Sequence, residues 1–262
     1  MTESLPPAIR TLLEKAAYDN GFDVAEAHQG TWLEFTSTRT ALRVWLGAAI
    51  PAGLAVALSR RNVAQALGEH GTAFGGPLPE GAHGARIVPD VPSVHRLLRR
   101  AFQLSRALPD ELLVEFQQRT GSMPKTTEAE RLVVQRVGQD LFRAGLVDYW
   151  DGRCAVTGLA VVELLRASHI KPWADCATDG ERLDVFNGLL LAPHLDAAFD
   201  RGLVTVADDG GVIVSDLLGP EARGVLGLEP PLRVLRLEEA HRTYLVWHRE
   251  KVFRKGSAPA NG

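Results

Sequence analysis

The sequence predicts an α+β protein in two parts, a small N-terminal α/β module and a C-terminal part of short elements, with a helical region between them. Three observations lead to this prediction. Helical and strand periodicities mix in the first 70 residues, two breaks rich in turn-forming residues interrupt the middle of the chain, and short elements follow Gly152. With 262 residues, 45% of them apolar, the chain can bury a substantial core.

The N-terminal module begins with an amphipathic helix, PPAIRTLLEKAAYDNG, which ends at a glycine. Three largely apolar runs predict strands: TWLEFTST, ALRVWLGA and GLAVALS. A second helix is predicted for RNVAQALGEHG, again closed by glycine. Residues 71–92 are dense in Gly and Pro, and they predict a linker or a long loop.

The middle of the chain has helical periodicity. The segment SVHRLLRRAFQLSRAL (93–108) places leucines on one side and arginines largely on the other, namely Arg96, Arg99, Arg100 and Arg106. Such a face suits either a solvated surface or contact with phosphate groups. The helical pattern continues in DELLVEFQQRTG and, after a break at SMPKTTEAE, in AERLVVQRVGQDLFRAGLVDYW. The break predicts a boundary between domains 1–120 and 121–262.

The elements after Gly152 are short. RCAVTGL and VELLRASHI predict paired strands, and DVFNGLLLAPHL predicts a loop that returns to an apolar run. HLDAAFDRG has helical spacing with a glycine stop. LVTVADDGGVIVS predicts a β-hairpin, and LEEAHRTYLVWHREKVFRKG predicts a C-terminal helix.

Composition and charge exclude several classes of protein. No stretch approaches 18 consecutive apolar residues and the start does not look like a signal peptide, so a cytoplasmic protein without membrane contact is expected. Cys154 and Cys176 form no CxxC pair, which argues against a disulfide scaffold and against a cysteine zinc knuckle. The net charge of −3 means that any contact with nucleic acid must come from local patches.

Four residues follow one another in an order that a hydrolytic metal site can use. Asp196 and Asp200 are four residues apart, so a helix places both within reach of one cation, and carboxylates suit Mg²⁺ or Mn²⁺. His169, with an ordinary pKa of roughly 6.5, can take a proton from an attacking water. Asn187 can hold the loop that orients the histidine. The imidazole and the helix are expected to meet at one gap the size of a phosphate.

The phrases RCAVTG, LLRASHIKPW and NGLLLAPHLDAAFDRGL, in this order, resemble the HNH endonuclease family, in its bacterial restriction-type branch. The resemblance covers roughly residues 131–255. It implies a C-terminal ββα-metal fold with an added hairpin and a C-terminal helix, in which His169 is the general base and Asn187 is the middle asparagine of the motif. Residues 1–120 carry no such motif, and they are expected to recognise the target.

The chain departs from the family pattern at the metal ligands. Many members have an acidic residue or a histidine directly before the base, where this chain has Ser168. Asp196 occupies the place of the final histidine of many members, and His194 lies two residues earlier. Three arrangements therefore remain open: Asp196 with Asp200, His194 entering from the loop, or Asn187 itself. The expected ion is Mg²⁺ or Mn²⁺, with Ni²⁺ or Zn²⁺ as alternatives.

The resemblance implies hydrolysis of DNA phosphodiester bonds, in restriction of foreign and also of modified DNA. Since one site cuts one strand, a homodimer is expected. Contact with DNA is expected from Lys171, Arg143, Arg136, Arg96, Arg99 and Arg100. Two other functions stay open: a catalytically inactive HNH-fold protein that binds DNA or regulates, and an effector whose N-terminal half recruits a protein. Trp32, Trp45 and Phe35 either form a core or line a pocket for a flipped or modified base.

Overall fold

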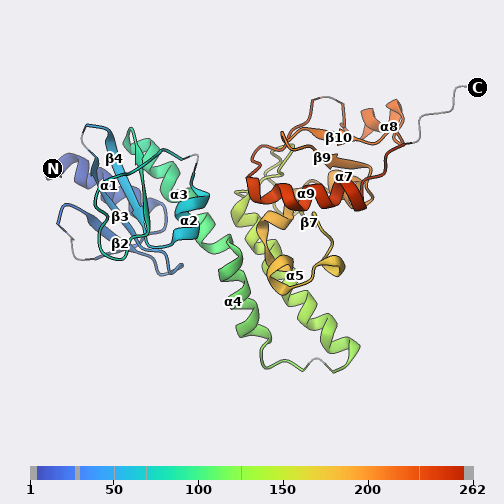
Figure 1. Cartoon of the computed structure of the whole chain (residues 1–262), viewed down its shortest axis with the longest axis horizontal. Coiled ribbons are helices and arrows are strands. Elements are labelled where there is room, and N and C mark those ends of the chain that lie inside the picture. The colour runs from blue at the N-terminus through green and yellow to red at the C-terminus, as the bar shows by residue number, and fades with distance from the viewer. Residues whose placement is uncertain are drawn as a thin grey trace, which may run out of the picture. The chain divides into compact units, whose positions relative to one another are not determined.

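The computed structural model describes residues 5–26, 30–49, 51–68, 70–124, 126–229 and 231–256. The chain forms two compact units, Met1–Leu108 and Pro109–Gly262, which are coloured blue to green and green to red in Figure 1. Helices and small sheets occur in both, so the predicted α+β class is confirmed. Among the described residues, no helix is both long and apolar enough to cross a membrane.

The division between the units lies before α4 (Pro109–Thr120), whereas a boundary at residues 120 and 121 was expected. The reason is that α4 packs against α5 (Glu128–Tyr149). Leu112 and Phe116 of α4 lie against two glycines of α5, since a Cβ atom at Gly145 would be 2.7 Å from Leu112 and one at Gly138 would be 3.2 Å from Phe116. The predicted break between the two helices is therefore a loop within one unit.

The N-terminal unit is built on an antiparallel sheet in the order β1-β2-β3-β4-β6-β5. Its strands are β1 (Val24–Ala25), β2 (Leu33–Thr36), β3 (Val44–Ala49), β4 (Gly53–Leu58), β5 (Thr72–Ala73) and β6 (Gly84–Val88). Its helices are α1 (Pro7–Asp19), α2 (Arg61–Ala66) and α3 (Val91–Ala107). The helices and strands predicted before residue 71 are all present.

The segment 71–92 is not a linker, because it contains β5 and β6. β6 lies between β4 and β5 and pairs with five of the six residues of β4, from Leu54 with Val88 to Leu58 with Gly84. The strand has only five residues, and the surrounding Gly and Pro residues dominate the composition of this stretch. Together with β1, which was not predicted either, β5 and β6 add three strands to the three that were predicted.

Aromatic residues of this sheet are core residues rather than the walls of a base pocket. Phe35 is 2% exposed and its ring meets Tyr18 of α1, so it faces the helices. Trp32 and Trp45 belong to a separate buried cluster, in which Phe74 packs edge-on against Trp32. Because the three rings lie on two faces of the sheet, they cannot line one pocket.

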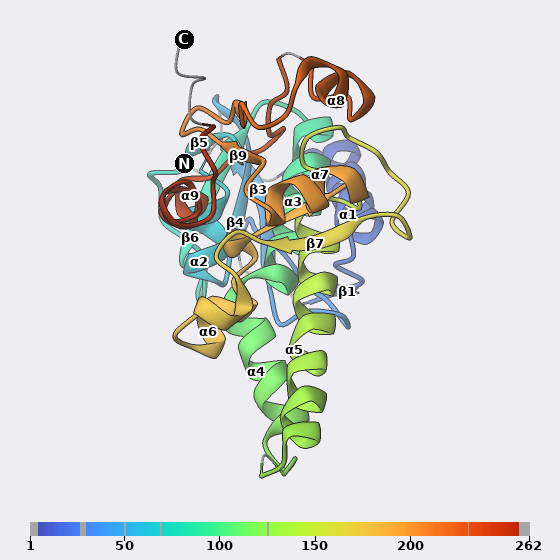
Figure 2. The ribbon, with the colours of Figure 1, turned by 90° about the vertical axis from the view of Figure 1, so that its right-hand side faces the viewer.

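The C-terminal unit contains the short elements that follow α5. They are β7 (Arg166–His169), α6 (Asp179–Leu183), β8 (Gly188–Leu191), α7 (Pro193–Asp200), β9 (Val204–Val206), β10 (Val212–Val214), α8 (Pro220–Val225) and α9 (Glu239–Lys251). β7 pairs antiparallel with β8, and α7 follows β8 directly, which gives a ββα arrangement. Figure 2 shows α7 and α5 on opposite sides of β7. The predicted hairpin forms between β9 and β10.

The segment RCAVTGL is a turn, although it was expected to be a strand. The backbone N–H groups of Thr157 and Ala192 point to the thiol sulfur of Cys154, at 3.4 and 3.3 Å. Gly158 has a φ of +72°, which ends any extended run, and its N–H donates to the carbonyl of Cys154 at 3.0 Å. Cys154 is fully buried, so it joins this turn to the start of α7. RCAVTGL, which was expected to pair with the strand that contains His169, is thus not a strand. β7 pairs with β8 instead.

Gly202 fixes the end of α7, and we expect its replacement to be costly. Its φ is +67°, and a Cβ atom would lie 2.0 Å from the carbonyl oxygen of Val252. Gly202→Ala should lower the free energy of unfolding by about 2–4 kcal/mol in urea titrations, through backbone strain and this clash. Gly227 has a φ of +62° and open space around it, so Gly227→Ala measures the strain alone. Equal losses in the two variants would contradict the contact with Val252.

Candidate active site

His169 ends β7, and its side chain lies on the α5 side of the two-stranded sheet. The ring stacks on Phe142 with centroids 3.7 Å apart, and it meets the edge of Trp173 at 5.7 Å. Nε2 lies 2.8 Å from the carbonyl oxygen of Arg182, which can only accept, so Nε2 carries the proton and Nδ1 keeps its lone pair. Burial lowers the pKa of His169 to about 4, so the ring is neutral at pH 7.

The glycine after Asn187 allows this stacking. Gly188 pairs with His169 across the sheet, and a Cβ atom at Gly188 would lie 2.5 Å from Phe142. Its φ is −153°, so the Asn-Gly pair serves a close approach here and not a hairpin turn. Without a side chain at position 188, the ring of Phe142 can approach the sheet and stack on the imidazole of His169.

Asn187 is completely buried and holds the loop between β7 and α6. Its Oδ1 accepts from the backbone N–H of Lys171 at 2.8 Å. Its Nδ2 donates to the carbonyl oxygens of Lys171 and Glu181, at 3.2 and 3.1 Å. Glu181 directly precedes Arg182, whose carbonyl fixes His169. The amide of Asn187 is therefore fully engaged with this loop and has no access to solvent.

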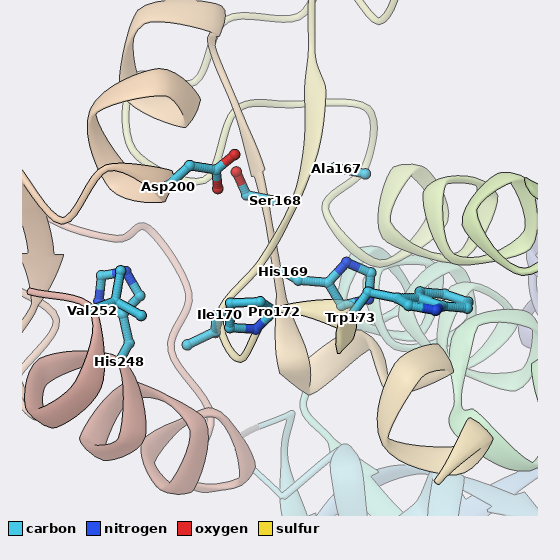
Figure 3. A pocket seen from close by; sticks show the side chains of 9 residues that line it. All are labelled: Ala167, Ser168, His169, Ile170, Pro172, Trp173, Asp200, His248 and Val252. Atoms are coloured by element: carbon cyan, nitrogen blue, oxygen red, sulfur yellow. The ribbon is translucent and has the colours of Figure 1, made fainter. Parts of the chain in front are cut away.

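The opposite face of β7 carries the oxygen groups. Ser168 precedes His169, so its side chain points the other way, and its hydroxyl donates to Asp196 Oδ1 on α7. Asp200 lies one helical turn after Asp196 on α7. Burial and the charge of Asp196 raise the pKa of Asp200 to about 6. The Asp200 carboxylate points towards Ser168 in Figure 3. Two carboxylates and a hydroxyl are thus close together on one side of the strand.

A pocket of about 360 Å³ connects the two faces. Ser168 and Asp200 line it, and so do His169 and Trp173. In Figure 3 the imidazole of His169 lies on the side of Trp173, away from Asp200. His169 and Asp200 therefore line one pocket from opposite sides, whereas the imidazole and the carboxylates were expected to meet at a single gap. A volume of this size suits a nucleotide-sized ligand, since small-molecule pockets occupy roughly 300–1,000 Å³.

The C-terminal helix contributes His248 to the same pocket. The ring is 1% exposed and stacks on Phe199 of α7 with centroids 3.9 Å apart. Nδ1 lies 2.9 Å from Oγ1 of Thr205, and Nε2 lies 3.2 Å from the carbonyl oxygen of Phe199. His248 therefore holds α9 against the end of α7 and has no nitrogen left for an ion.

The buried imidazoles predict acid sensitivity of the fold. Burial lowers the pKa of His248 to about 4, against roughly 6.5 in the unfolded chain. The unfolded state therefore binds more protons between these values, so this contribution to stability is complete above pH 6.5 and is lost as the pH falls towards 4. His169 acts in the same direction, and Asp200, with its raised pKa, acts in the opposite one.

For His248 the expected loss between pH 7.5 and pH 5 is about 2 kcal/mol of the free energy of unfolding. Urea titrations at the two pH values should show a smaller loss in His248→Gln than in the unchanged chain. The same pH dependence in both proteins would rule out this role of His248.

Other residues with predicted roles at the site lie elsewhere. His194 is exposed in the first turn of α7 and does not line the pocket. The ammonium group of Lys171 pairs with Glu181 at 3.0 Å. The guanidinium of Arg143 donates to the carbonyls of Val162 and Leu165, so it fixes the chain before β7. The charged groups of Lys171 and Arg143 are thus both engaged within the protein.

Arginines on the two long helices differ in exposure. Arg136 is exposed on α5, and Arg96 and Arg99 are exposed on α3. Arg100, for which contact with DNA was also predicted, is only 3% exposed, because it lies on the buried side of α3. The helix turns 100° per residue, which separates Arg100 from its exposed neighbour Arg99.

Residues 154–207 match the family described as HNH endonuclease. The C-terminal unit contains an HNH domain. A solved structure titled "Modification dependent TagI restriction endonuclease" aligns with 44% of this chain and 39% of its own, at 21% sequence identity and a TM-score of 0.31. The chain thus spans less than half of the protein it is aligned with. A search of curated proteins gives no match.

Several parts of the HNH domain site leave no signal that sequence reasoning could use. The carbonyl of Arg182 is a backbone group, which every residue possesses. Phe142 precedes the matched segment, and its apolar position on α5 is typical of any core residue. His248 was predicted only as part of the C-terminal helix, yet the buried residues His241, Leu245 and His248 recur at every third or fourth position of α9 and form a helical stripe.

Proposed function

We propose that the chain is a metal-dependent HNH endonuclease that hydrolyses DNA phosphodiester bonds in the restriction of foreign DNA, including modified DNA. The observation that carries this proposal is the bond from Nε2 of His169 to the carbonyl of Arg182. It fixes the tautomer in which Nδ1 is the acceptor, as a general base requires. His169 also lines the same pocket as Asp200.

The charges of the pocket support a requirement for a cation. Its described lining contains no Lys or Arg, and His169 and His248 are neutral at pH 7, while Asp200 brings negative charge. A phosphodiester would be repelled there without a positive ion. When bound, a divalent cation would offset the charge that develops on the phosphate and its leaving oxygen.

The residues present fit a hard cation. Asp196 and Asp200 would hold it through carboxylate oxygens, beside the hydroxyl of Ser168. Mg²⁺ and Mn²⁺ suit these oxygen groups better than Ni²⁺ or Zn²⁺ do. Among the described residues, no three His, Cys, Asp or Glu side chains cluster as a metal site, so the remaining ligands would be water, which Mg²⁺ usually keeps.

Each of the chain's own residues would have a separate role in the reaction. His169 takes a proton from water at Nδ1, and the anionic substrate raises its low pKa towards neutrality. Asn187 and Arg182 keep the imidazole in place. The N-terminal unit would select the target, with the exposed Arg96 and Arg99 as contacts to phosphate groups. A cut through both strands would use two protomers, and the activity would be cytoplasmic.

One contact favours a second function. The hydroxyl of Ser168 donates to Asp196, so two groups at the expected metal position satisfy each other without an ion. An HNH-fold protein that binds DNA without cutting it would tolerate this arrangement. The two functions differ in one measurable property, which is metal-dependent strand cleavage.

The deciding experiment is nicking of supercoiled plasmid by the full chain with Mg²⁺, Mn²⁺ or Ni²⁺, and with EDTA. We expect nicking with Mg²⁺ or Mn²⁺, none with EDTA, and a loss of at least about a hundredfold in Asp196→Asn/Asp200→Asn. Binding of DNA without nicking under every ion would favour the second function. Nicking that persists in EDTA would exclude the role given to the cation.

A further inference from the structure

The C-terminal unit has a second pocket, of about 100 Å³, that shares no lining residue with the active-site pocket. It lies where the chain leaves α5 and where a later segment returns before α9. Its walls are Trp150, Asp151, Arg153, Cys154, Leu235 and Arg236. A water molecule occupies roughly 30 Å³ in the liquid, so the pocket has room for a few waters or for one tetrahedral oxyanion.

Trp150 is one of the residues that line this pocket, and its indole N–H is a buried donor. The residue is 4% exposed, and its indole N–H has no acceptor among the described residues. Buried donors are nearly always satisfied in folded proteins, so such a group indicates a bound water or ligand. An indole nitrogen can donate but cannot accept, so the missing partner must be an acceptor.

Two guanidinium groups border the same space. Arg236 donates one N–H to the carbonyl oxygen of Tyr149 at 2.9 Å, which holds the side chain and leaves its other N–H groups available for a ligand. Arg153 is exposed and reaches the carbonyl of Gly158 only at 3.5 Å. Planar guanidinium groups match the oxygens of a phosphate, which they can bind in pairs.

One acidic residue opposes these donors. Asp151 lines the pocket, and it is the one non-glycine residue with a positive φ, 55°, in the described part of the chain. Its carboxylate reduces the positive charge of the pocket but does not cancel two arginines. Asn accepts this backbone conformation as readily as Asp, so the charge can be removed without strain.

We propose that this pocket binds a phosphate-type anion through Arg153, Arg236 and the indole N–H of Trp150. The anion is either a backbone phosphate of a nucleic acid or a free phosphate or sulfate ion. The proposal does not rest on nuclease activity, because none of these residues belongs to the active site.

The first test measures the thermal midpoint of the full chain against inorganic phosphate, in EDTA and at constant ionic strength. A ligand that binds only the folded state raises the midpoint, and the concentration dependence gives its Kd. Trp150→Phe removes one N–H and keeps an aromatic ring, and Arg153→Gln removes one exposed charge. Each is expected to weaken phosphate binding about tenfold, as the loss of a charge-assisted hydrogen bond does.

Two further variants sharpen the result. Asp151→Asn should strengthen binding about threefold, because it removes a like charge. Arg242→Gln is the matched control, since Arg242 pairs with Glu239 on the exposed part of α9 and should leave binding unchanged. Phosphate binding that is absent, or that is the same in Trp150→Phe, Arg153→Gln and Asp151→Asn as in the unchanged chain, overturns the proposal.

The source of the anion follows from DNA binding at several salt concentrations, with Ca²⁺ in place of Mg²⁺. If the pocket holds a backbone phosphate, Arg153→Gln should reduce the slope of log Kobs against log salt by about 0.9. An unchanged slope, together with weakened phosphate binding, assigns the pocket to a free anion. Both outcomes support the site, and they remain readable when no nicking activity is found.

Discussion

A His169→Ala variant should lose about 10²–10⁴-fold of the plasmid nicking rate, which is the usual contribution of a general base. The imidazole is held on three sides, by the face of Phe142, the edge of Trp173 and the carbonyl of Arg182. Because these contacts fix a single tautomer, the remaining nitrogen is the only one that can take a proton from water. Alanine supplies no base, and no other described imidazole of the pocket has a free nitrogen.

The matched control for this variant is His194→Ala. His194 lies in the same domain, but it is exposed and outside the pocket, so its loss should leave the nicking rate within about threefold. His169→Gln preserves more of the volume against Phe142 and guards against a loss due to unfolding alone, and circular dichroism with thermal melting checks the fold of each variant. Nicking by His169→Ala at a tenth or more of the normal rate would remove His169 from the mechanism.

Asn187→Ala is expected to lower the free energy of unfolding by about 3–5 kcal/mol and to abolish nicking, since it leaves several buried backbone groups without partners. The affected groups are the N–H and carbonyl of Lys171 and the carbonyl of Glu181. Release of Glu181 also frees the neighbouring carbonyl that fixes His169. One side chain would thus control both the stability of the domain and the orientation of His169.

Asn187→Asp separates a positioning role from metal ligation. Aspartate can still accept from Lys171, and it would be an equal or better ligand for a cation. It cannot donate, and it would place a negative oxygen against two carbonyl oxygens, so a loss as large as that of Asn187→Ala is expected in urea titrations. If Asn187→Asp nicks DNA at nearly the normal rate, the ligand role is supported and the positioning role fails.

The fold could be predicted from sequence where a single periodicity runs over many residues. α3 and α5 have long helical patterns, and the β9–β10 hairpin combines alternation with an Asp-Gly turn. Short apolar runs were less informative, because the surroundings decide their structure. RCAVTGL is apolar enough for a strand but contains a left-handed glycine, whereas the strand β6 is hidden among glycines and prolines.

The candidate site was predictable only in part. Motif order indicated His169 and Asn187, and the spacing on α7 indicated that Asp196 and Asp200 share a face. Neighbouring residues of a strand point to opposite faces, so Ser168 and His169 lie on opposite faces of β7. This could have been predicted from the sequence. The imidazole and the carboxylates of α7 were nevertheless expected to meet at one gap. The backbone partners of Asn187 and of the imidazole could not be predicted, because any residue type offers the same carbonyl.

The thiol of Cys154 has a consequence for how the protein can be handled. It accepts from two backbone N–H groups and so joins the turn before β7 to the start of α7. In small domains this kind of bracing is often left to a structural zinc ion, whose removal unfolds the protein. Here the buried Cys154 side chain braces the fold, so assembly of the domain would be separate from loading of the proposed catalytic ion. Chelator-treated protein should stay folded and accept whichever divalent ion is added afterwards.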